Sequence, residues 1–114
     1  MDYRYGSHTV FQIEYHFVWV TKYRYKVLTE EVAERVRELV RQVCATFEIR
    51  IVKGEVSKDH VHILVSAPPT MAPSEIMRRI KGNTASRLFE GFPHLKKRYC
   101  GDGIFGYEDT FVPQ

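Results

Sequence analysis

Residues 48–67 read EIRIVKGEVSKDHVHILVSA and predict two β-strands joined by a short polar turn. The two ends of the segment, 48–56 and 60–67, are rich in β-branched residues, and the turn between them is Ser57-Lys58-Asp59. Two such runs around a short polar turn are typical of an antiparallel hairpin. The pair Pro68-Pro69 then ends the second strand, because proline cannot donate a hydrogen bond to a neighbouring strand.

A helix is predicted on each side of this hairpin. From Thr29 onward apolar residues recur every three or four positions, and Thr29 itself suits the N-cap. A second helix is expected to begin at Pro73 and to end at the sequence Gly-Phe-Pro of residues 91–93. Gly82 interrupts it at a cost of about 1 kcal/mol relative to alanine, which indicates a close approach of helix, sheet or ligand. The positions expected to face the core are Val32, Val36, Leu39, Val40, Val43, Cys44 and Phe47 in the first helix and Ile76, Met77, Ile80, Leu88 and Phe89 in the second.

Strand-like stretches at residues 10–21 and 104–112 complete the pattern. The resulting order of strand, helix, strand, strand, helix, strand is the split β-α-β arrangement of ferredoxin-like folds. We therefore predict an α+β, ferredoxin-like βαββαβ fold, with an antiparallel sheet and two helices on one face. The 114 residues suffice for a single domain over 1–114 and are too few for a second.

The composition is that of a folded protein in a reducing compartment. Hydrophobic residues make up 44% and charged residues 27% of the chain, which excludes the composition of a disordered segment. Cys44 and Cys100 stand far apart, so neither belongs to a CxxC motif, and Cys44 is expected to pack in the first helix. With no signal peptide and no apolar run longer than a strand, we expect a cytoplasmic protein without a membrane span.

The second strand of the hairpin carries two histidines one residue apart. Side chains alternate along a strand, so His60 and His62 point to one face while Val61 and Ile63 point to the other. Two imidazoles about 7 Å apart at their α-carbons can converge on one divalent ion at metal–nitrogen distances of about 2.1 Å. Such an ion would serve phosphodiester cleavage, because it polarises a phosphate oxygen. The spacing by itself also fits two polar residues on a solvated sheet face.

Four stretches of the chain together resemble the HUH single-tyrosine transposases of the insertion sequence 200/605 type, the IS200-like transposases. They occur in the order of that family and span roughly residues 10–100. The stretches are YHFVWVTKYR at 15–24, DHVHILV at 59–65, IKGNTASRLF at 80–89 and FPHLKKRY at 92–99. The combination, rather than any one stretch, identifies the family.

The resemblance implies a site, an activity and partners. It implies that His60-Val61-His62 is the HUH motif of the family and holds Mg²⁺ or Mn²⁺. The implied activity is that of a metal-dependent DNA transposase, which nicks and transfers single strands through a tyrosine nucleophile. The implied partners are single-stranded DNA hairpins at the ends of a mobile element and a second copy of the chain in a homodimer.

The nucleophile of that family matches no residue of this chain. In the family a tyrosine on a C-terminal helix attacks the phosphate, and a glutamine one turn later completes the metal site. This chain stops where that helix would begin, so we expect the C-terminal catalytic helix to be missing. Tyr107 is the only candidate in the tail, but it lies in a predicted strand or loop with no glutamine four residues on, and a packing or surface role suits it better. We therefore expect binding of metal and DNA with deficient cleavage.

Two groups of basic residues are predicted DNA contacts. In the first, basic and aromatic residues alternate, a mixture that can neutralise phosphates and offer flat rings to unstacked bases. This first group consists of Lys22, Arg24 and Lys26, interleaved with Tyr23 and Tyr25. The second group lies on the second helix and consists of Arg78, Arg79, Lys81 and Arg87. Charged turns and solvated helix faces have the same composition, and the resemblance is what favours DNA contact. His16 and His94 are expected to be structural.

Two alternatives to a transposase stay open on the residues alone. A non-catalytic module that binds single-stranded nucleic acid could use the same ferredoxin-like sheet, although the Phe-rich motifs of RNA-recognition domains are absent from the central strands. A small metal-dependent enzyme that acts on a small molecule is compatible with the histidine pair, but the sequence shows no further cluster of carboxylates or other ligands to support it. The net charge of +3 suits a polyanionic partner without distinguishing these alternatives.

Overall fold

The computed structural model describes residues 12–100 and 103–113, except for the side chains of residues 107–111 and 113. Each predicted helix and strand is present, with bounds close to those expected. The elements are β1 (Ile13–Thr21), the short 3-10 turn η1 (Lys22–Arg24), α1 (Glu30–Thr46), β2 (Arg50–Val56), β3 (His60–Ala67), α2 (Pro73–Gly91), α3 (Pro93–Arg98) and β4 (Phe105–Pro113).

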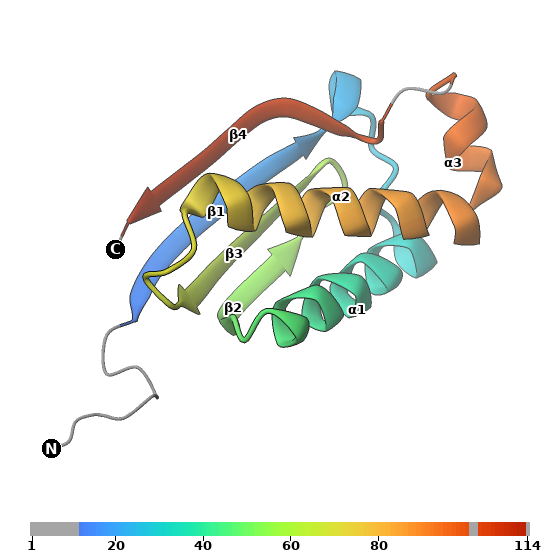
Figure 1. Cartoon of the computed structure of the whole chain (residues 1–114). Coiled ribbons are helices and arrows are strands. Elements are labelled where there is room, and N and C mark those ends of the chain that lie inside the picture. The colour runs from blue at the N-terminus through green and yellow to red at the C-terminus, as the bar shows by residue number, and fades with distance from the viewer. Residues whose placement is uncertain (1–11, 101–102, 114) are drawn as a thin grey trace, which may run out of the picture.

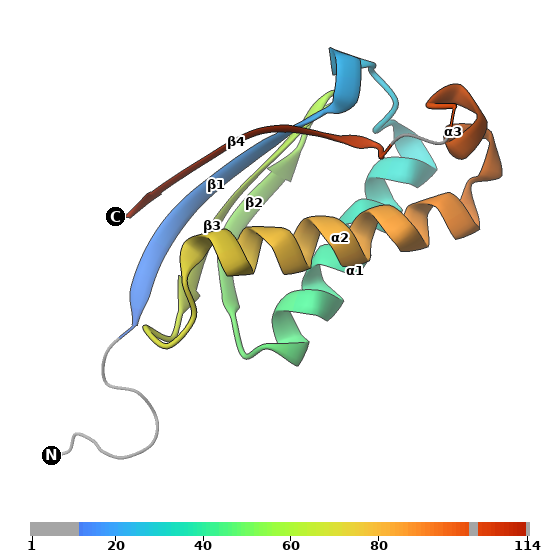
Figure 2. The same cartoon turned by 45° about the horizontal axis from the view of Figure 1, so that its top comes forward.

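The strands form one antiparallel sheet in the order β2-β3-β1-β4, so β1 and β3 are its central strands. In this register Val18 lies opposite His62, and Val20 lies opposite His60. The helices α1 and α2 pack against the same face of the sheet, and no described helix covers the other face (Figure 1, Figure 2). The structure confirms the predicted α+β ferredoxin-like arrangement. We call the face without helices the open face.

The core lies between the sheet and the two long helices. Every second side chain of β1 and of the first part of β3 is buried, so Phe17, Trp19, Val61 and Ile63 face the helices. Burying a large apolar side chain stabilises a fold by about 1.5–3 kcal/mol relative to leaving it exposed. The alternation therefore holds the sheet against the helices and directs the residues in between to the open face. The helices contribute Val36, Leu39, Ile76, Ile80 and Leu88, all fully buried.

The structure differs from the prediction at several element ends. Pro93, expected to end the second helix, begins the further short helix α3, because proline suits a first turn in which its missing N–H has no partner to lose. Phe47 and Phe89, expected in the core, are half-buried at its rim. The strand expected from 48 begins at Arg50, after the positive φ of 58° at Glu48. The expected start of the first strand at residue 10 lies outside the described residues.

Two predictions from composition can be compared with the described residues. Cys44 is buried in α1 as predicted, and burial raises the pKa of its thiol to about 12, so the thiol stays protonated and unreactive near neutral pH. Cys100 is exposed. Among the described helices, none has the length and apolar composition needed to cross a membrane.

Gly54 and Gly82 have opposite surroundings. A Cβ atom on Gly54 in β2 would come within 2.9 Å of Ile63 Cγ2, whereas a Cβ atom on Gly82 in α2 would meet no described atom within 4 Å. The expected close approach of a helix or the sheet at Gly82 is therefore wrong for the described residues, and approach of a ligand stays a prediction. The glycine that permits a close approach is Gly54, which lies opposite Ile63 in the sheet.

We expect Gly54→Ala to lower the free energy of unfolding by about 1–3 kcal/mol, because Ile63 is buried and β-branched and cannot easily move aside. Gly82→Ala is the matched control and should raise it by up to about 1 kcal/mol, since alanine is favoured in a helix interior. Urea unfolding followed by circular dichroism measures both values. Changes of the same sign and size would contradict this assignment.

Candidate metal and nucleic-acid site

The two histidines of β3 lie on the open face of the sheet. Their neighbours Val61 and Ile63 are buried against the helices, whereas His60 and His62 are both half-buried. The predicted side-chain alternation is confirmed. Because β3 is hydrogen-bonded to β1 on one side and to β2 on the other, both histidines have a rigid backbone support.

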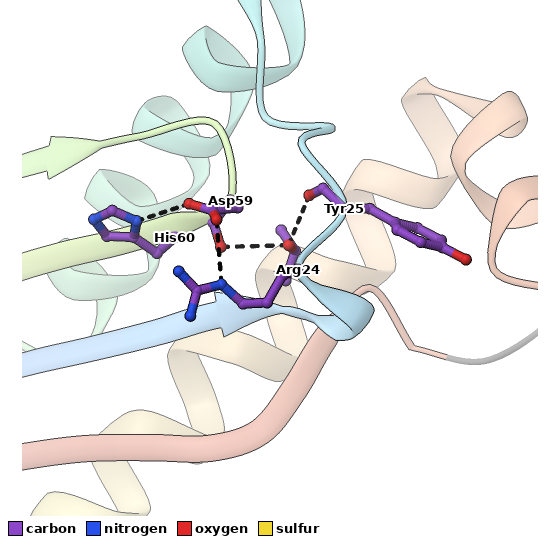
Figure 3. Close-up of polar contacts among 5 residues, drawn as sticks. Arg24, Tyr25, Asp59 and His60 are labelled. Carbon is purple, nitrogen blue, oxygen red and sulfur yellow. Dashed lines mark hydrogen bonds and ion pairs between the residues drawn. The ribbon is translucent and has the colours of Figure 1, made fainter.

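Asp59, at the start of β3, contacts both His60 and Arg24. His60 Nδ1 lies 3.0 Å from Asp59 Oδ1, and Arg24 Nε donates to Oδ2 of the same carboxylate at 3.2 Å (Figure 3). The hydrogen bond with His60, followed by the one with Arg24, lowers the pKa of the Asp59 carboxyl below its ordinary value. Asp59 is therefore ionised at neutral pH. The contacts of Asp59 with His60 and Arg24 were not predicted from the sequence.

His62 lies in an open depression together with His16 and Glu55. The ring centroids of His62 and His16 are 4.5 Å apart, and Glu55 of β2 lies directly opposite His62, so their side chains share one face. The depression is lined by His16, Lys53, Gly54, Glu55, His62 and Leu64. His16 was expected to be structural, yet its alternation with the buried Tyr15 and Phe17 would have put it on this face. No feature of the sequence alone indicates that Glu55 lies beside His62.

The donor set suits a divalent ion that is shared with a substrate. His60 and His62 offer two imidazoles, but the described residues contain no group of three or more His, Cys, Asp or Glu side chains able to hold one ion. Ions such as Mg²⁺ commonly combine few protein ligands with waters and substrate phosphates. The two histidines therefore fit an open site, which takes its remaining ligands from elsewhere, rather than a closed structural one.

In the first group of predicted DNA contacts, Arg24 lies beside His60, to which Asp59 connects it. Arg24 is 64% exposed, and its contact with Asp59 joins η1 to the start of β3 across 35 positions of sequence. Lys22 Nζ lies 5.6 Å from the centre of the Tyr23 ring, and Lys26 is exposed. One donor of Arg24 is thus used internally, while the exposed remainder of its guanidinium faces solvent near Asp59 and His60.

The second group, on α2, lies in the helical layer on the other side of the sheet (Figure 2). The structure therefore does not bring these residues together with His60 and His62. Each makes an internal contact: Arg78 and Arg79 with Glu75 at 2.9 and 2.6 Å, Lys81 with the Gly106 carbonyl oxygen at 2.7 Å, and Arg87 with Gln42 at 3.3 Å. These contacts favour a packing role, and DNA contact by this group stays a prediction.

Three tyrosines form an aromatic cluster next to the site. The ring of Tyr25 lies 5.3 Å from those of Tyr23 and Tyr99, and Arg98 lies over Tyr25 at 4.3 Å. Tyr23 is 61% exposed, and both Tyr23 and Arg24 have a positive φ, which bulky residues rarely adopt. Tyr99 is buried, and burial raises its pKa, so it is poorly suited to act as a nucleophile. Tyr23 is thus the exposed ring of a packed cluster.

Tyr107, the candidate nucleophile in the tail, was expected in a strand or loop and belongs to the strand β4. Its side chain lies outside the described residues. Its role therefore stays a prediction.

The sequence matches the protein family described as "Transposase IS200 like" over residues 9–111. It is 37% identical over 100 residues to the ISDra2 transposase TnpA of Deinococcus radiodurans. That match covers 88% of this chain and 71% of that protein. It is 34% identical over 93 residues to the transposase for insertion sequence element IS200 of Salmonella typhimurium. That match covers 82% of this chain and 61% of the Salmonella protein, so the chain spans less than two thirds of that relative.

Solved structures share the fold. A crystal structure of a proposed transposase from Deinococcus radiodurans R1 has a TM-score of 0.86 at 33% identity, over 96% of this chain and 85% of that one. A REP-associated tyrosine transposase bound to a REP hairpin has a TM-score of 0.64 at 16% identity, over 99% of this chain and 62% of that one, a likeness of fold alone. Sequence and fold together define a transposase. The chain belongs to the family of IS200-like transposases, and the predicted resemblance is confirmed.

Proposed function

We propose that this chain binds single-stranded DNA hairpins of a mobile element on the open face of its sheet, at a divalent ion held by His60 and His62. The observation that carries the proposal is the position of both imidazoles on the uncovered face of a central strand. Membership in a transposase family supports DNA as the substrate. The likeness in fold to a transposase bound to a REP hairpin also supports a hairpin ligand.

In this proposal each residue of the site has a distinct task. His60 and His62 supply nitrogen ligands, and a bound Mg²⁺ or Mn²⁺ would polarise a non-bridging phosphate oxygen. Arg24, which Asp59 connects to His60, and the exposed Lys26 contribute positive charge for the DNA backbone. The nucleophile stays unassigned. Among the described tyrosine side chains, Tyr15 and Tyr99 are buried, and Tyr23 and Tyr25 pack with Tyr99 in the aromatic cluster.

The wider properties implied by the resemblance are also proposals. We propose that residues 1–114 form one domain, since the α-helices and strands that the structure describes contribute to a single core. We propose a homodimer and a cytoplasmic location on the resemblance. Both the homodimer and the location rest on the resemblance to the family, not on a contact observed within this chain.

Binding of a labelled DNA hairpin with a single-stranded flank tests the proposed function. With Mn²⁺ present, we expect tighter binding of this hairpin than of a fully paired duplex of the same length, measured by fluorescence anisotropy. The affinity should fall between about 50 and 200 mM salt, because neutralising phosphates releases counterions. An affinity that does not depend on salt, or that is no higher for the hairpin, would contradict the proposal. Analysis of the same mixtures on denaturing gels tests for deficient cleavage, which a covalent protein–DNA product would refute.

Tyr23→Ala should weaken binding of the hairpin by about 5- to 150-fold, because base stacking on an aromatic ring is worth about 1–3 kcal/mol. The exposed Tyr23 ring, backed by Tyr25 and Tyr99, offers a flat surface to an unpaired base. Tyr23→Phe is the matched control and should keep most of the affinity, since it retains the ring. Anisotropy titrations measure both variants. An equal loss for hairpin and duplex would point to damage to the fold instead of lost stacking.

A further inference from the structure

We infer that Asp59 is a positioning residue that holds the His60 imidazole in one orientation, with the proton on Nδ1 and with Nε2 presented to a divalent ion. The inference rests on the proposed metal site and adds to it a residue that does not touch the ion. It starts from the contact of 3.0 Å between His60 Nδ1 and Asp59 Oδ1 (Figure 3).

A carboxylate that faces one ring nitrogen determines which nitrogen carries the proton. A neutral imidazole has one N–H donor and one acceptor nitrogen, and an ionised carboxylate only accepts, so Nδ1 of His60 must be the donor. Nε2 then keeps its lone pair, which is the form that binds a metal. Such a carboxylate also fixes the ring orientation and makes the histidine a stronger ligand.

Asp59 itself is held from two directions. Arg24 Nε donates to the second carboxylate oxygen, Oδ2, at 3.2 Å. The backbone N–H of Thr21 donates to the Asp59 carbonyl oxygen at 2.9 Å, and the buried Thr21 hydroxyl lies 3.3 Å from the same oxygen. Both the backbone and the side chain of Asp59 are therefore tied to the end of β1 and to η1.

The turn that carries Asp59 is anchored as well. Ser57 N–H donates to the His60 carbonyl oxygen at 2.8 Å, and Leu28 N–H donates to the Lys58 carbonyl oxygen at 2.9 Å. Leu28 is buried in the core, so the turn cannot shift without disturbing the packing. His60 is thus oriented by a supported neighbour before any ion arrives, which is the condition for a well-ordered ligand.

The imidazole of His60 in the metal-free protein gives the most direct test. At a pH where the ring is neutral, ¹⁵N nuclear magnetic resonance distinguishes protonated from unprotonated ring nitrogens. The signals are assigned by their loss in His60→Gln. We expect the proton on Nδ1 in the wild type and a shift toward Nε2 in Asp59→Asn, because an amide can donate to Nδ1 as well as accept from it. A wild-type ring protonated at Nε2 would overturn the inference, whether or not any variant folds.

Binding of Mn²⁺ alone, followed by electron paramagnetic resonance of the free ion, gives the second readout. Asp59→Asn should bind Mn²⁺ about 10- to 100-fold more weakly than the wild type, as expected for an outer partner of a metal ligand. Arg24→Gln should show a smaller loss, because the contact between Asp59 and His60 remains. Glu14→Gln is the matched control: it removes one carboxylate from the exposed side of β1 without touching this network and should leave Mn²⁺ affinity unchanged.

The outcomes separate this inference from the proposed function. If the wild type binds Mn²⁺ and Asp59→Asn binds it equally well with an unchanged His60 proton position, the positioning role is wrong and the metal site stands. If the wild type binds no Mn²⁺, the proposed metal site fails, and the inference fails with it. A loss of Mn²⁺ affinity in Glu14→Gln as large as in Asp59→Asn would mean that net charge, not the contact with His60, controls binding.

Discussion

Replacing His60 and His62 together with alanine should weaken binding of Mn²⁺ by more than about 100-fold, because even the outer partners of metal ligands are commonly worth about 10- to 100-fold. The two imidazoles are the only ligands that the chain is proposed to supply, and the described residues hold no cluster of three or more ligating side chains that could replace them. The free Mn²⁺ signal in electron paramagnetic resonance measures the affinity. If the ion bridges protein and phosphate, the double substitution should also weaken binding of the hairpin. Removal of the metal with a chelator should weaken hairpin binding of the wild type to the same extent.

His94→Ala is the matched control for this result. His94 is exposed on α3, where its ring lies edge-on to that of Phe92 at a centroid distance of 6.1 Å. Its substitution removes an imidazole of the same chemistry from a different part of the molecule, so Mn²⁺ binding should be unchanged. Retention of tight binding by the double variant would show that the ion, if bound, is held elsewhere, and the proposed function would lose its metal site.

Trp19→Ala should lower the free energy of unfolding by about 3–5 kcal/mol, the range for removing a large aromatic side chain from a core. Trp19 is fully buried on the helix side of β1, and its ring meets Phe105 of β4 edge-on at a centroid distance of 6.1 Å. Domains are commonly stable by only about 5–15 kcal/mol, so this one substitution would remove a large share of the total. Urea unfolding should be followed by circular dichroism, because Trp19 is the single tryptophan of the chain.

Val52→Ala provides the comparison for Trp19→Ala. Val52 lies on β2 and is 40% exposed, so its truncation should change stability by no more than about 0.5 kcal/mol. The loss of unfolding free energy in Trp19→Phe should lie between those of the two alanine variants. It loses volume, but it also removes an indole N–H that is buried without a hydrogen-bond partner among the described residues. A loss below about 1 kcal/mol for Trp19→Ala would contradict the assignment of Trp19 to the core.

Most of the fold could be predicted because it follows from local periodicity. The strand-like runs at 10–21, 48–56, 60–67 and 104–112 and the spacing of two helices were sufficient for the element order. That order was sufficient for the ferredoxin-like arrangement. The errors fall where one residue type has two meanings. Pro93 can end one helix or begin another, and Gly82 can mark a close approach or simply tolerate solvent. Only the neighbours in space decide between such meanings.

The candidate site was predictable where its residues are neighbours on one strand and not where they come from different strands. Alternation alone puts His60 and His62 on one face, and it could have added His16. The contacts of Asp59 with Arg24 and of His62 with Glu55 depend on strand pairing and register, which no local pattern specifies. The separation of Arg24, which contacts Asp59, from the basic residues of α2 in the helical layer has the same cause.

By itself the sequence determined the order of helices and strands, the shared face of the two histidines and the family, because these depend on spacing along the chain and on motifs read in order. Tertiary structure alone decided that Asp59 supports His60, that Tyr23 is the exposed ring of an aromatic cluster, and that the α2 arginines lie away from the site. The physical reason is that hydrogen bonds and ring contacts act over a few ångströms in space, and folding brings together residues that are far apart in sequence.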